Sequence, residues 1–170
     1  FASINIGTTM GLLGMGIIFY ACAEKLRIEG IQVFLISNVT CIASRERDAG
    51  KFVLGPITLG LGAMLALLFY PEPAASLAIY ALAFGDSISS LAGKLLNSAI
   101  IPLTGGKTIA GSLGCFITVL VIFYRITGNV TVSIILAFTA TVLEMMPSKD
   151  LDNLLIPVGT GFVAYKLLIV

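Results

Sequence analysis

The 170-residue chain contains no histidine and no tryptophan, and only 11% of its residues are charged. Without histidine, catalysis by imidazole and a histidine-ligated metal are excluded for the chain as given. Its net charge of +1 gives no basis for a nucleic-acid-binding surface. The three cysteines, Cys22, Cys41 and Cys115, lie far apart in apolar stretches, so neither a disulfide framework nor a metal-binding spacing is expected.

Apolar residues dominate what is present. Hydrophobic types make up 58% of the chain, whereas soluble domains average about a quarter charged residues, which predicts an integral membrane protein. A membrane-spanning helix needs roughly 20 mostly apolar residues. Six segments approach this length: residues 4–23, 52–70, 74–93, 112–126, 130–146 and 154–170.

Two segments depart from a simple spanning helix. Residues 31–44 are too few to cross a bilayer comfortably and predict an interfacial or re-entrant helix. Residues 154–170 contain Pro157, Gly159 and Gly161, which predict an irregular start followed by a helix. The fold class expected is therefore all-α: a polytopic membrane helix bundle of about six spans plus one short interfacial or re-entrant helix, in a single domain over residues 1–170.

Basic residues indicate the orientation of this bundle. The short connections around residues 71–73 and 127–129 carry no Lys or Arg, while the other connections hold eight of the ten basic residues. The positive-inside rule assigns those connections to the cytoplasm. The chain starts at Phe1 within apolar sequence and without an initiator Met, so we expect that an upstream N-terminal helix is missing.

A carboxylate interrupts the apolar segment 74–96. Asp86 costs several kcal/mol at such a position unless something compensates it, so its default interpretation is functional. Helical spacing places Asp86, Ser89, Ser90 and Gly93 on one face, which predicts a polar site facing the interior of the bundle. The alternative is a structural ion pair between Asp86 and a neighbouring Lys or Arg.

Further carboxylates are expected at the same membrane face. Glu144, Asp150 and Asp152 surround a helix end broken by Pro147, and together with Asp86 they supply hard oxygen ligands. Mg²⁺ typically binds one or two carboxylates plus substrate phosphates and water, so these four residues are predicted metal ligands. For Asp150 and Asp152 taken alone, an ordinary solvated loop is the competing interpretation.

A glycine-rich loop joins two of the predicted helices. Gly105 and Gly106 allow backbone N–H groups to approach a phosphate, Lys107 adds a point charge, and Thr108 adds a hydroxyl. The Walker A spacing is absent, because Ile101 stands where that motif has glycine. The loop is therefore predicted to be an anion site of another kind.

A second basic segment, residues 44–51, contains Arg45 and Arg47. These guanidinium groups are predicted either to anchor the chain to anionic lipid headgroups or to neutralise phosphate at the mouth of the site. Both roles are compatible with a position next to the membrane surface.

In combination, these motifs resemble the CTP-dependent lipid kinases, which include dolichol, phytol and fungal-type diacylglycerol kinases and are similar to phosphatidate cytidylyltransferases. The resemblance rests on Gly85-Asp86 with Gly93, on Gly106-Lys107-Thr108 with Gly111, and on Glu144 and Pro147 with Asp150, Asp152 and Asn153. It implies a CTP-transferase-like membrane domain with Mg²⁺ as cofactor and CTP as co-substrate. By this resemblance, the residues that bind the phosphates and Mg²⁺ are Asp86, Lys107, Glu144, Asp150, Asp152 and Asn153, with Gly93 close to the nucleotide.

The expected reaction is transfer of the γ-phosphoryl group of CTP to a lipid alcohol at the cytoplasmic interface, with Asp86, Glu144 and Lys107 as catalytic residues. Two alternatives remain open: a phosphatidate cytidylyltransferase that makes CDP-diacylglycerol, and a small ion-coupled transporter, since intramembrane carboxylates also mark ion paths. This chain has Ala110 where the family commonly has Glu, which also admits an inactive scaffold. The expected partners are a membrane lipid and CTP, without nucleic acid; a homodimer is compatible with the sequence.

Overall fold

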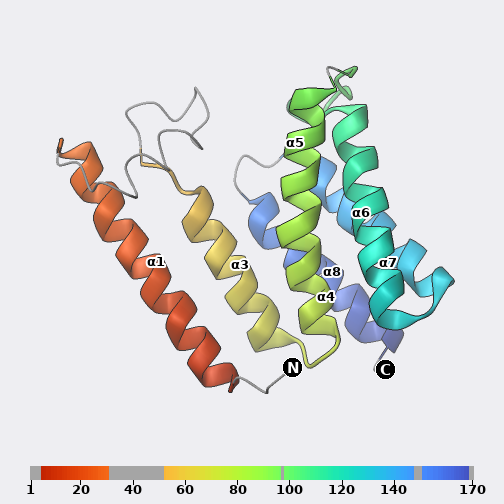
Figure 1. Ribbon diagram of the computed structural model, residues 1–170, viewed down its shortest axis with the longest axis horizontal. Helices are drawn as coiled ribbons and strands as arrows, with labels where there is room; N and C mark the ends of the chain where they lie inside the picture. The colour runs from red at the N-terminus through yellow and green to blue at the C-terminus, as the bar shows by residue number, and fades with distance from the viewer. Residues whose placement is uncertain (1–4, 31–51, 97, 148–150, 169–170) are drawn as a thin grey trace. The chain divides into compact units, whose positions relative to one another are not determined.

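The computed structural model describes residues 5–30, 52–96, 98–147 and 151–168. Every regular element in these ranges is a helix, and an isolated antiparallel bridge joins Ile100 to Thr108. The elements are α1 (Ile6–Ile28), α3 (Gly55–Phe69), α4 (Ala74–Tyr80), η2 (Ala81–Asp86), α5 (Ser87–Leu95), α6 (Ile109–Thr127), α7 (Val130–Met145) and α8 (Asp152–Leu168) (Figure 1). The predicted all-α fold is confirmed. The predicted short helix at residues 31–44 lies outside the described residues.

Three helices are long and apolar enough to cross a membrane: α1, the continuous rod Ala74–Leu95 formed by α4, η2 and α5, and α6. Two more, α3 and α7, are apolar but shorter. The bounds agree closely with the predicted segments, the largest extension being α1, which runs to Ile28. The helices therefore form a membrane bundle, in which α8 is a further helix of 17 residues.

Helix ends follow local chemistry. The Thr108 hydroxyl accepts a hydrogen bond from the Gly111 N–H at the start of α6, and the Asn129 side chain accepts one from the Val132 N–H at the start of α7. Between them, Gly128 adopts a left-handed conformation with φ 65° and ends α6. These two caps and one glycine place α6 and α7 side by side as a tight antiparallel pair (Figure 1).

The expected irregular start of the last segment is wrong. Helix α8 begins at Asp152 and continues through Pro157. Pro157 has no N–H to donate to the carbonyl of Asn153. That carbonyl packs against Gly62 in α3, so closely that no side chain would fit at position 62. Gly161 likewise lies directly against the ring of Tyr70. The small residues of α8 therefore serve helix packing and do not interrupt the helix.

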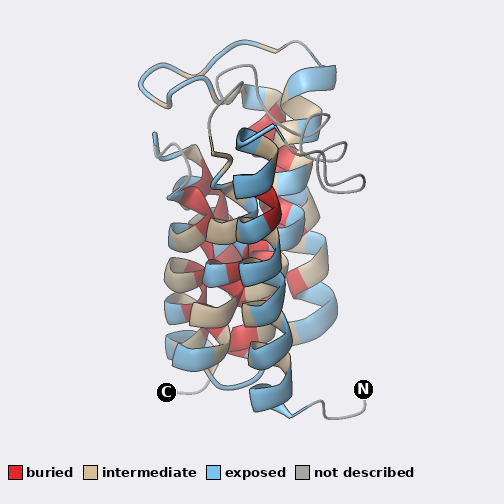
Figure 2. Cartoon of the chain, turned by 90° about the vertical axis from the view of Figure 1, so that its left-hand side faces the viewer, coloured by how far each residue is buried: buried red, intermediate tan, exposed pale blue. Residues whose placement is uncertain are grey.

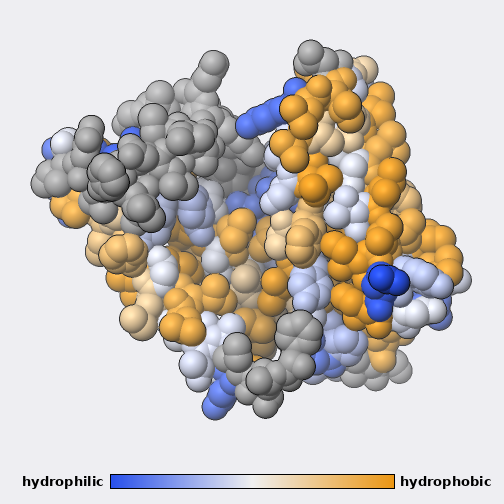
Figure 3. All heavy atoms as spheres, viewed as in Figure 1, coloured by the Kyte–Doolittle hydropathy of each residue, from blue (hydrophilic) through white to orange (hydrophobic). Residues whose placement is uncertain are grey.

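The bundle has a small-residue interior and an apolar exterior. Buried positions are rich in Ala, Ser and Thr, whereas large apolar side chains are exposed along helix faces. On α6, Leu113, Ile117, Val121 and Tyr124 are between 48% and 58% exposed at helical spacing. Figure 2 shows the buried positions, and Figure 3 shows how much of one face is apolar. This distribution is expected where lipid replaces water as the solvent.

Contacts divide the chain into two compact units, Phe1–Gly60 and Leu61–Val170. In the first, the buried carboxylate of Glu24 accepts two hydrogen bonds from Arg27, at 2.8 and 2.7 Å, and one from the Val53 N–H at 2.9 Å. The Tyr20 hydroxyl donates to the Val53 carbonyl at 3.1 Å. Both backbone groups of Val53 are therefore fixed to α1. In the second unit, α8 packs against α4 and α7, and α6 packs against α5 and α7.

Candidate functional site

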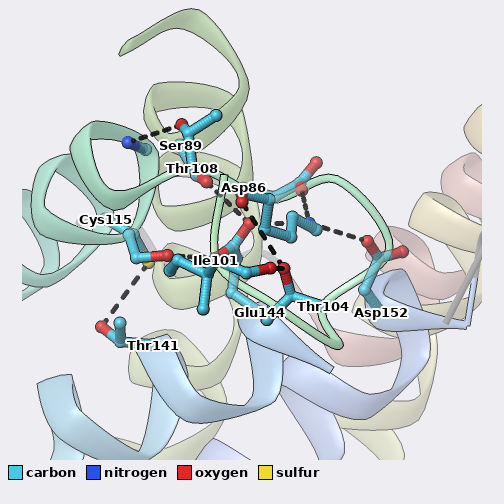
Figure 4. A network of polar contacts seen from close by, with 12 residues as sticks. Asp86, Ser89, Ile101, Thr104, Thr108, Cys115, Thr141, Glu144 and Asp152 are labelled. Carbon is cyan, nitrogen blue, oxygen red and sulfur yellow. Dashed lines mark hydrogen bonds and ion pairs between the residues drawn. The ribbon is translucent and has the colours of Figure 1, made fainter. Parts of the chain in front are cut away.

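A cluster of carboxylates surrounds the ammonium group of Lys107 at one end of the second unit. The Nζ atom lies 2.6 Å from Oε1 of Glu144, 3.3 Å from Oδ2 of Asp152 and 4.0 Å from Oδ1 of Asp86. The acidic residues come from α7, the first turn of α8 and η2, and Figure 4 shows them converging. We call Asp86, Lys107, Glu144 and Asp152 the Lys107 cluster. The structure thus brings four of the predicted site residues together.

A short hairpin-like turn fixes Lys107 in position. The Ile101 N–H donates to the carbonyl of Lys107 at 2.9 Å, and the Ile109 N–H donates to that of Ala99 at 3.0 Å. Thr104 closes the turn, because its hydroxyl donates to the carbonyl of Ile101 at 2.7 Å. The loop predicted from its glycines is therefore tied down on both sides of Lys107, which limits the conformations open to its backbone.

Glu144 is the most enclosed member of the cluster. Its side chain is 0% exposed, and Oε1 accepts hydrogen bonds from the Ser89 hydroxyl and from Lys107, each at 2.6 Å. Its other oxygen accepts a longer bond from the Ser112 hydroxyl at 3.5 Å. A buried carboxylate with charged and hydroxyl donors is well satisfied, so Glu144 can hold Lys107 in a defined place.

Asp86 reaches the cluster from a π-helical turn. It is the last residue of η2, a wide turn of a kind that is frequent at functional sites. Within this turn, Gly85 packs closely on α6: a Cβ there would lie 3.2 Å from both Cys115 Sγ and Val119. The Asp86 side chain is 20% exposed and that of Lys107 is 22% exposed. The cluster is therefore accessible on the side of Asp86 and Lys107 and closed on the side of Glu144.

At the start of α8, Asp152 is 4% exposed, and its Oδ1 accepts a hydrogen bond from the Asn153 N–H at 3.0 Å while Oδ2 faces Lys107. A carboxylate in the first turn of a helix is favourable, because unpaired N–H groups carry partial positive charge there. Asn153 is buried next to it. Asp152 therefore belongs to the Lys107 cluster, and the role expected for Asn153 stays a prediction.

The remaining loop residues have clear local roles. Gly105 and Gly106 have positive φ angles of 71° and 105°, which glycine adopts readily. A Cβ on Gly93 would lie 2.8 Å from Oγ1 of Thr108, so the glycine lets α5 approach the start of α6. The Thr108 hydroxyl caps α6. A contact between this hydroxyl and a nucleotide would be a second role, and it remains a prediction.

Three predicted site residues, Arg45, Arg47 and Asp150, lie outside the described residues. Conversely, the motif reasoning missed Ser112. Its signal was present, since Ser112 follows Thr108 by one helical turn and therefore shares a face with the loop end. A second polar pair lies deeper, where the Thr141 hydroxyl is 3.9 Å from Cys115 Sγ.

The electrostatics keep Lys107 charged. Burial lowers its pKa, but the hydrogen bond and charge of Glu144 raise it, as do the charges of Asp152 and Asp86, so that the pKa lies above the usual value for lysine. One ammonium neutralises at most one of the three carboxylates that it faces. The cluster is therefore an electronegative site that attracts additional cations.

The Lys107 cluster offers few oxygen ligands to a metal ion. Among the parts of the chain that the structure describes, no group of three or more His, Cys, Asp or Glu side chains is arranged to hold a metal by itself. The oxygens of Asp86 and Asp152 are nevertheless hard ligands on either side of Lys107. Mg²⁺ takes few protein ligands when phosphates complete its shell, and its binding by this pair remains a prediction.

Comparison with known proteins gives one consistent group of relatives. Neither family models nor solved structures match the chain. Phytol kinase 1, chloroplastic, of Arabidopsis thaliana is 25% identical over 159 residues, covering 83% of this chain and 52% of the relative. The probable phytol kinase, chloroplastic, of Zea mays is 23% identical over 161 residues, covering 84% and 53%.

An uncharacterized protein of Methanocaldococcus jannaschii is 26% identical over 152 residues, covering 88% of this chain and 73% of its own. The alignments therefore cover most of the chain, which spans about half the length of the plant relatives. With the all-helical fold and its apolar exterior, the protein is a membrane protein similar in sequence to phytol kinases.

Proposed function

We propose that the protein is a membrane-bound lipid kinase that transfers the γ-phosphoryl group of CTP to a lipid alcohol. The observation that supports this most directly is the Lys107 cluster, in which one cation and three carboxylates meet at the end of an apolar bundle. Phosphoryl transfer needs mainly positioning and charge neutralisation, which such a group can supply. Similarity to phytol kinases supports a lipid alcohol as acceptor.

In the proposed site, Lys107 neutralises phosphate oxygens, and Asp86 and Asp152 are the ligands of Mg²⁺. A bound Mg²⁺ would supply positive charge that offsets the charge developing on the phosphate oxygens. Glu144 acts as a positioning residue, because it is enclosed and accepts hydrogen bonds from Lys107 and two hydroxyls. It holds the ammonium where a phosphate can replace Asp86 as its partner.

The glycine loop and the second basic segment complete the proposed nucleotide site. Gly105 and Gly106 let the backbone approach the triphosphate, in keeping with their positive φ angles. Asp150 and Asn153 lie next to the cluster in sequence, and we assign them to metal and nucleotide binding respectively. We assign Arg45 and Arg47 to outer phosphate contacts, on the basis of sequence alone.

The lipid alcohol enters from the bilayer, whose apolar chains match the exposed faces of the helices. Asp86 is the better candidate to accept the hydroxyl proton, because it is partly exposed whereas Glu144 is fully buried and hydrogen-bonded. We assign this reaction to the cytoplasmic side, and the excess of basic residues on the connections supports this orientation.

The assay uses purified protein in lipid nanodiscs, with Mg²⁺ and a panel of lipid alcohols: phytol, a polyprenol and diacylglycerol. The proposal predicts that label from γ-labelled CTP appears in a lipid phosphate, while label from α-labelled CTP stays in the nucleotide. Entry of α-label into a CDP-lipid from phosphatidate would reveal a cytidylyltransferase. Transfer from ATP but not from CTP would change only the nucleotide donor in the proposal and would leave the lipid kinase reaction in place.

A matched pair of variants tests the site. Asp86→Asn keeps the shape of the side chain but removes its charge and its capacity to accept a proton, so transfer should fall by about 100-fold or more. Glu72→Gln, an exposed carboxylate in the connection between α3 and α4, should transfer at the wild-type rate. Full activity of Asp86→Asn would refute the assigned role.

A further inference from the structure

The end of α5 and the loop that joins it to α6 expose large apolar side chains beside the Lys107 cluster. Leu95 is 71% exposed, Leu96 66%, Ile100 65% and Leu103 94%. We call these four residues the apolar rim. Loops that face water are usually polar, and a large side chain such as Leu103 that is almost completely exposed is unfavourable there. Water is therefore an unfavourable surrounding for the apolar rim.

The exposure of the rim is a property of a folded turn. Hydrogen bonds from Ile101 to the carbonyl of Lys107 and from Ile109 to the carbonyl of Ala99 close the base of the loop. The Thr104 hydroxyl, which follows Leu103 in the chain, also donates to the Ile101 carbonyl. With its base and one side fixed in this way, the loop presents Leu103 outward.

Leu103 also has an unfavourable backbone conformation. Its φ angle is 69°, in the left-handed region, where a residue with a Cβ is disfavoured and glycine or asparagine is preferred. Among the described residues outside glycine, no other φ is positive. Leucine is therefore unfavourable here both for the backbone conformation and for contact with water. A favourable apolar partner for its side chain would offset both costs.

The position of the loop identifies that partner. The rod Ala74–Leu95 has 22 residues, about 33 Å at 1.5 Å per residue, which matches a hydrocarbon core of about 30 Å. The loop begins where this rod ends and returns at Ile109, the first residue of α6. Exposed apolar residues continue from the rim along both helices, with Leu91 on α5 and Leu113 on α6. The rim is thus continuous with the lipid-facing surface.

We propose that the apolar rim inserts into one leaflet of the bilayer at the boundary between headgroups and acyl chains. Lys107 lies on the return arm of the same turn, so insertion of the rim fixes the depth at which the Lys107 cluster sits in the membrane. This inference concerns where the cluster sits in the membrane, and it does not depend on which nucleotide or acceptor is used.

The chain has no tryptophan, so Leu103→Trp creates a single fluorescent reporter at an exposed position. The protein is reconstituted into vesicles of phosphatidylcholine whose acyl chains carry bromine at shallow or deep positions. Trp at position 103 should lose most fluorescence with shallow bromine and be protected from aqueous acrylamide. Two reference variants set the scale: Ile117→Trp, on the exposed face of α6, should respond to deep bromine, and Glu72→Trp to acrylamide.

Because tryptophan itself prefers membrane interfaces, a second reporter tests Leu103 directly. Ile100→Trp is combined with Leu103→Asp or, as the matched control, with Leu103→Met. The proposal predicts that Leu103→Asp weakens quenching by shallow bromine and strengthens quenching by acrylamide, whereas Leu103→Met changes neither. Equal quenching in both double variants would overturn it. Protection from acrylamide without any bromine quenching would also overturn it, because it would indicate that protein and not lipid covers the rim.

Discussion

Replacing Glu144 by Gln removes one charge from the Lys107 cluster while keeping its shape. The Glu144 carboxylate is 0% exposed and accepts 2.6 Å hydrogen bonds from both Lys107 and Ser89. A hydrogen bond to a charged group contributes about 1.5–3 kcal/mol. Leaving a buried charge without a partner costs about 3–5 kcal/mol. The loss of stability is smaller here, because Lys107 keeps Asp152 at 3.3 Å and Asp86 at 4.0 Å. We expect a loss of about 2 kcal/mol, or a factor of about 30 in the folded-to-unfolded ratio.

The thiol of Cys115 reports this loss. It is 1% exposed, so a maleimide reacts with it only when the bundle opens, and the reaction rate follows the open fraction. In a background with Cys22→Ser and Cys41→Ser, Glu144→Gln should react about 30 times faster than the parent in nanodiscs. The exposed control Glu72→Gln should react at the parent rate.

Two results would refute the reasoning behind Glu144→Gln. An unchanged rate would mean that the contact with Lys107 adds no measurable stability. A rate as high as that of Glu144→Ala, which also removes the hydrogen-bonding atoms, would mean that charge alone accounts for the interaction and that the Ser89 hydroxyl contributes nothing.

Three other variants test separate parts of the structure by thermal unfolding in nanodiscs. Lys107→Met leaves carboxylates facing one another, so the midpoint should fall and added Mg²⁺ should restore part of it; no response to Mg²⁺ would argue against metal binding by the cluster. Gly62→Ala should destabilise by about 1–3 kcal/mol, because its Cβ overlaps a backbone carbonyl of α8, whereas Gly11→Ala, which has open space, should not. Glu24→Gln should lower the midpoint by weakening its ion pair and its bond to the segment before α3, while the exposed Glu29→Gln should leave it unchanged.

Much of the fold could be predicted because membrane helices depend on one strong signal, a long apolar run. The capped ends of α6 and α7 were also readable, since Gly128 and Asn129 act through the backbone within a few residues. Pro157 misled the prediction for α8. Pro157 and the carbonyl of Asn153 pack against Gly62 in another helix, and such contacts between distant segments leave no local pattern in the sequence.

The candidate site was predictable in its members and not in its geometry. Alternating helix directions indicate that Lys107, Glu144 and Asp152 share one end of the bundle. The sequence does not indicate that Lys107 stands between the carboxylates, because this follows from how the loop folds back through the bridge between Ile100 and Thr108. The π-helical turn that ends at Asp86 is equally unmarked in the sequence, and Gly85 within it packs closely against α6.

All four members of the Lys107 cluster come from the stretch between Asp86 and Asp152, within the second compact unit. Assembly of the charged centre accordingly requires only the later helices to find one another. A chimera in which the first compact unit is replaced would therefore keep the Lys107 cluster and change only what the first unit contributes. Diversification of the first unit would leave the residues of the Lys107 cluster unchanged.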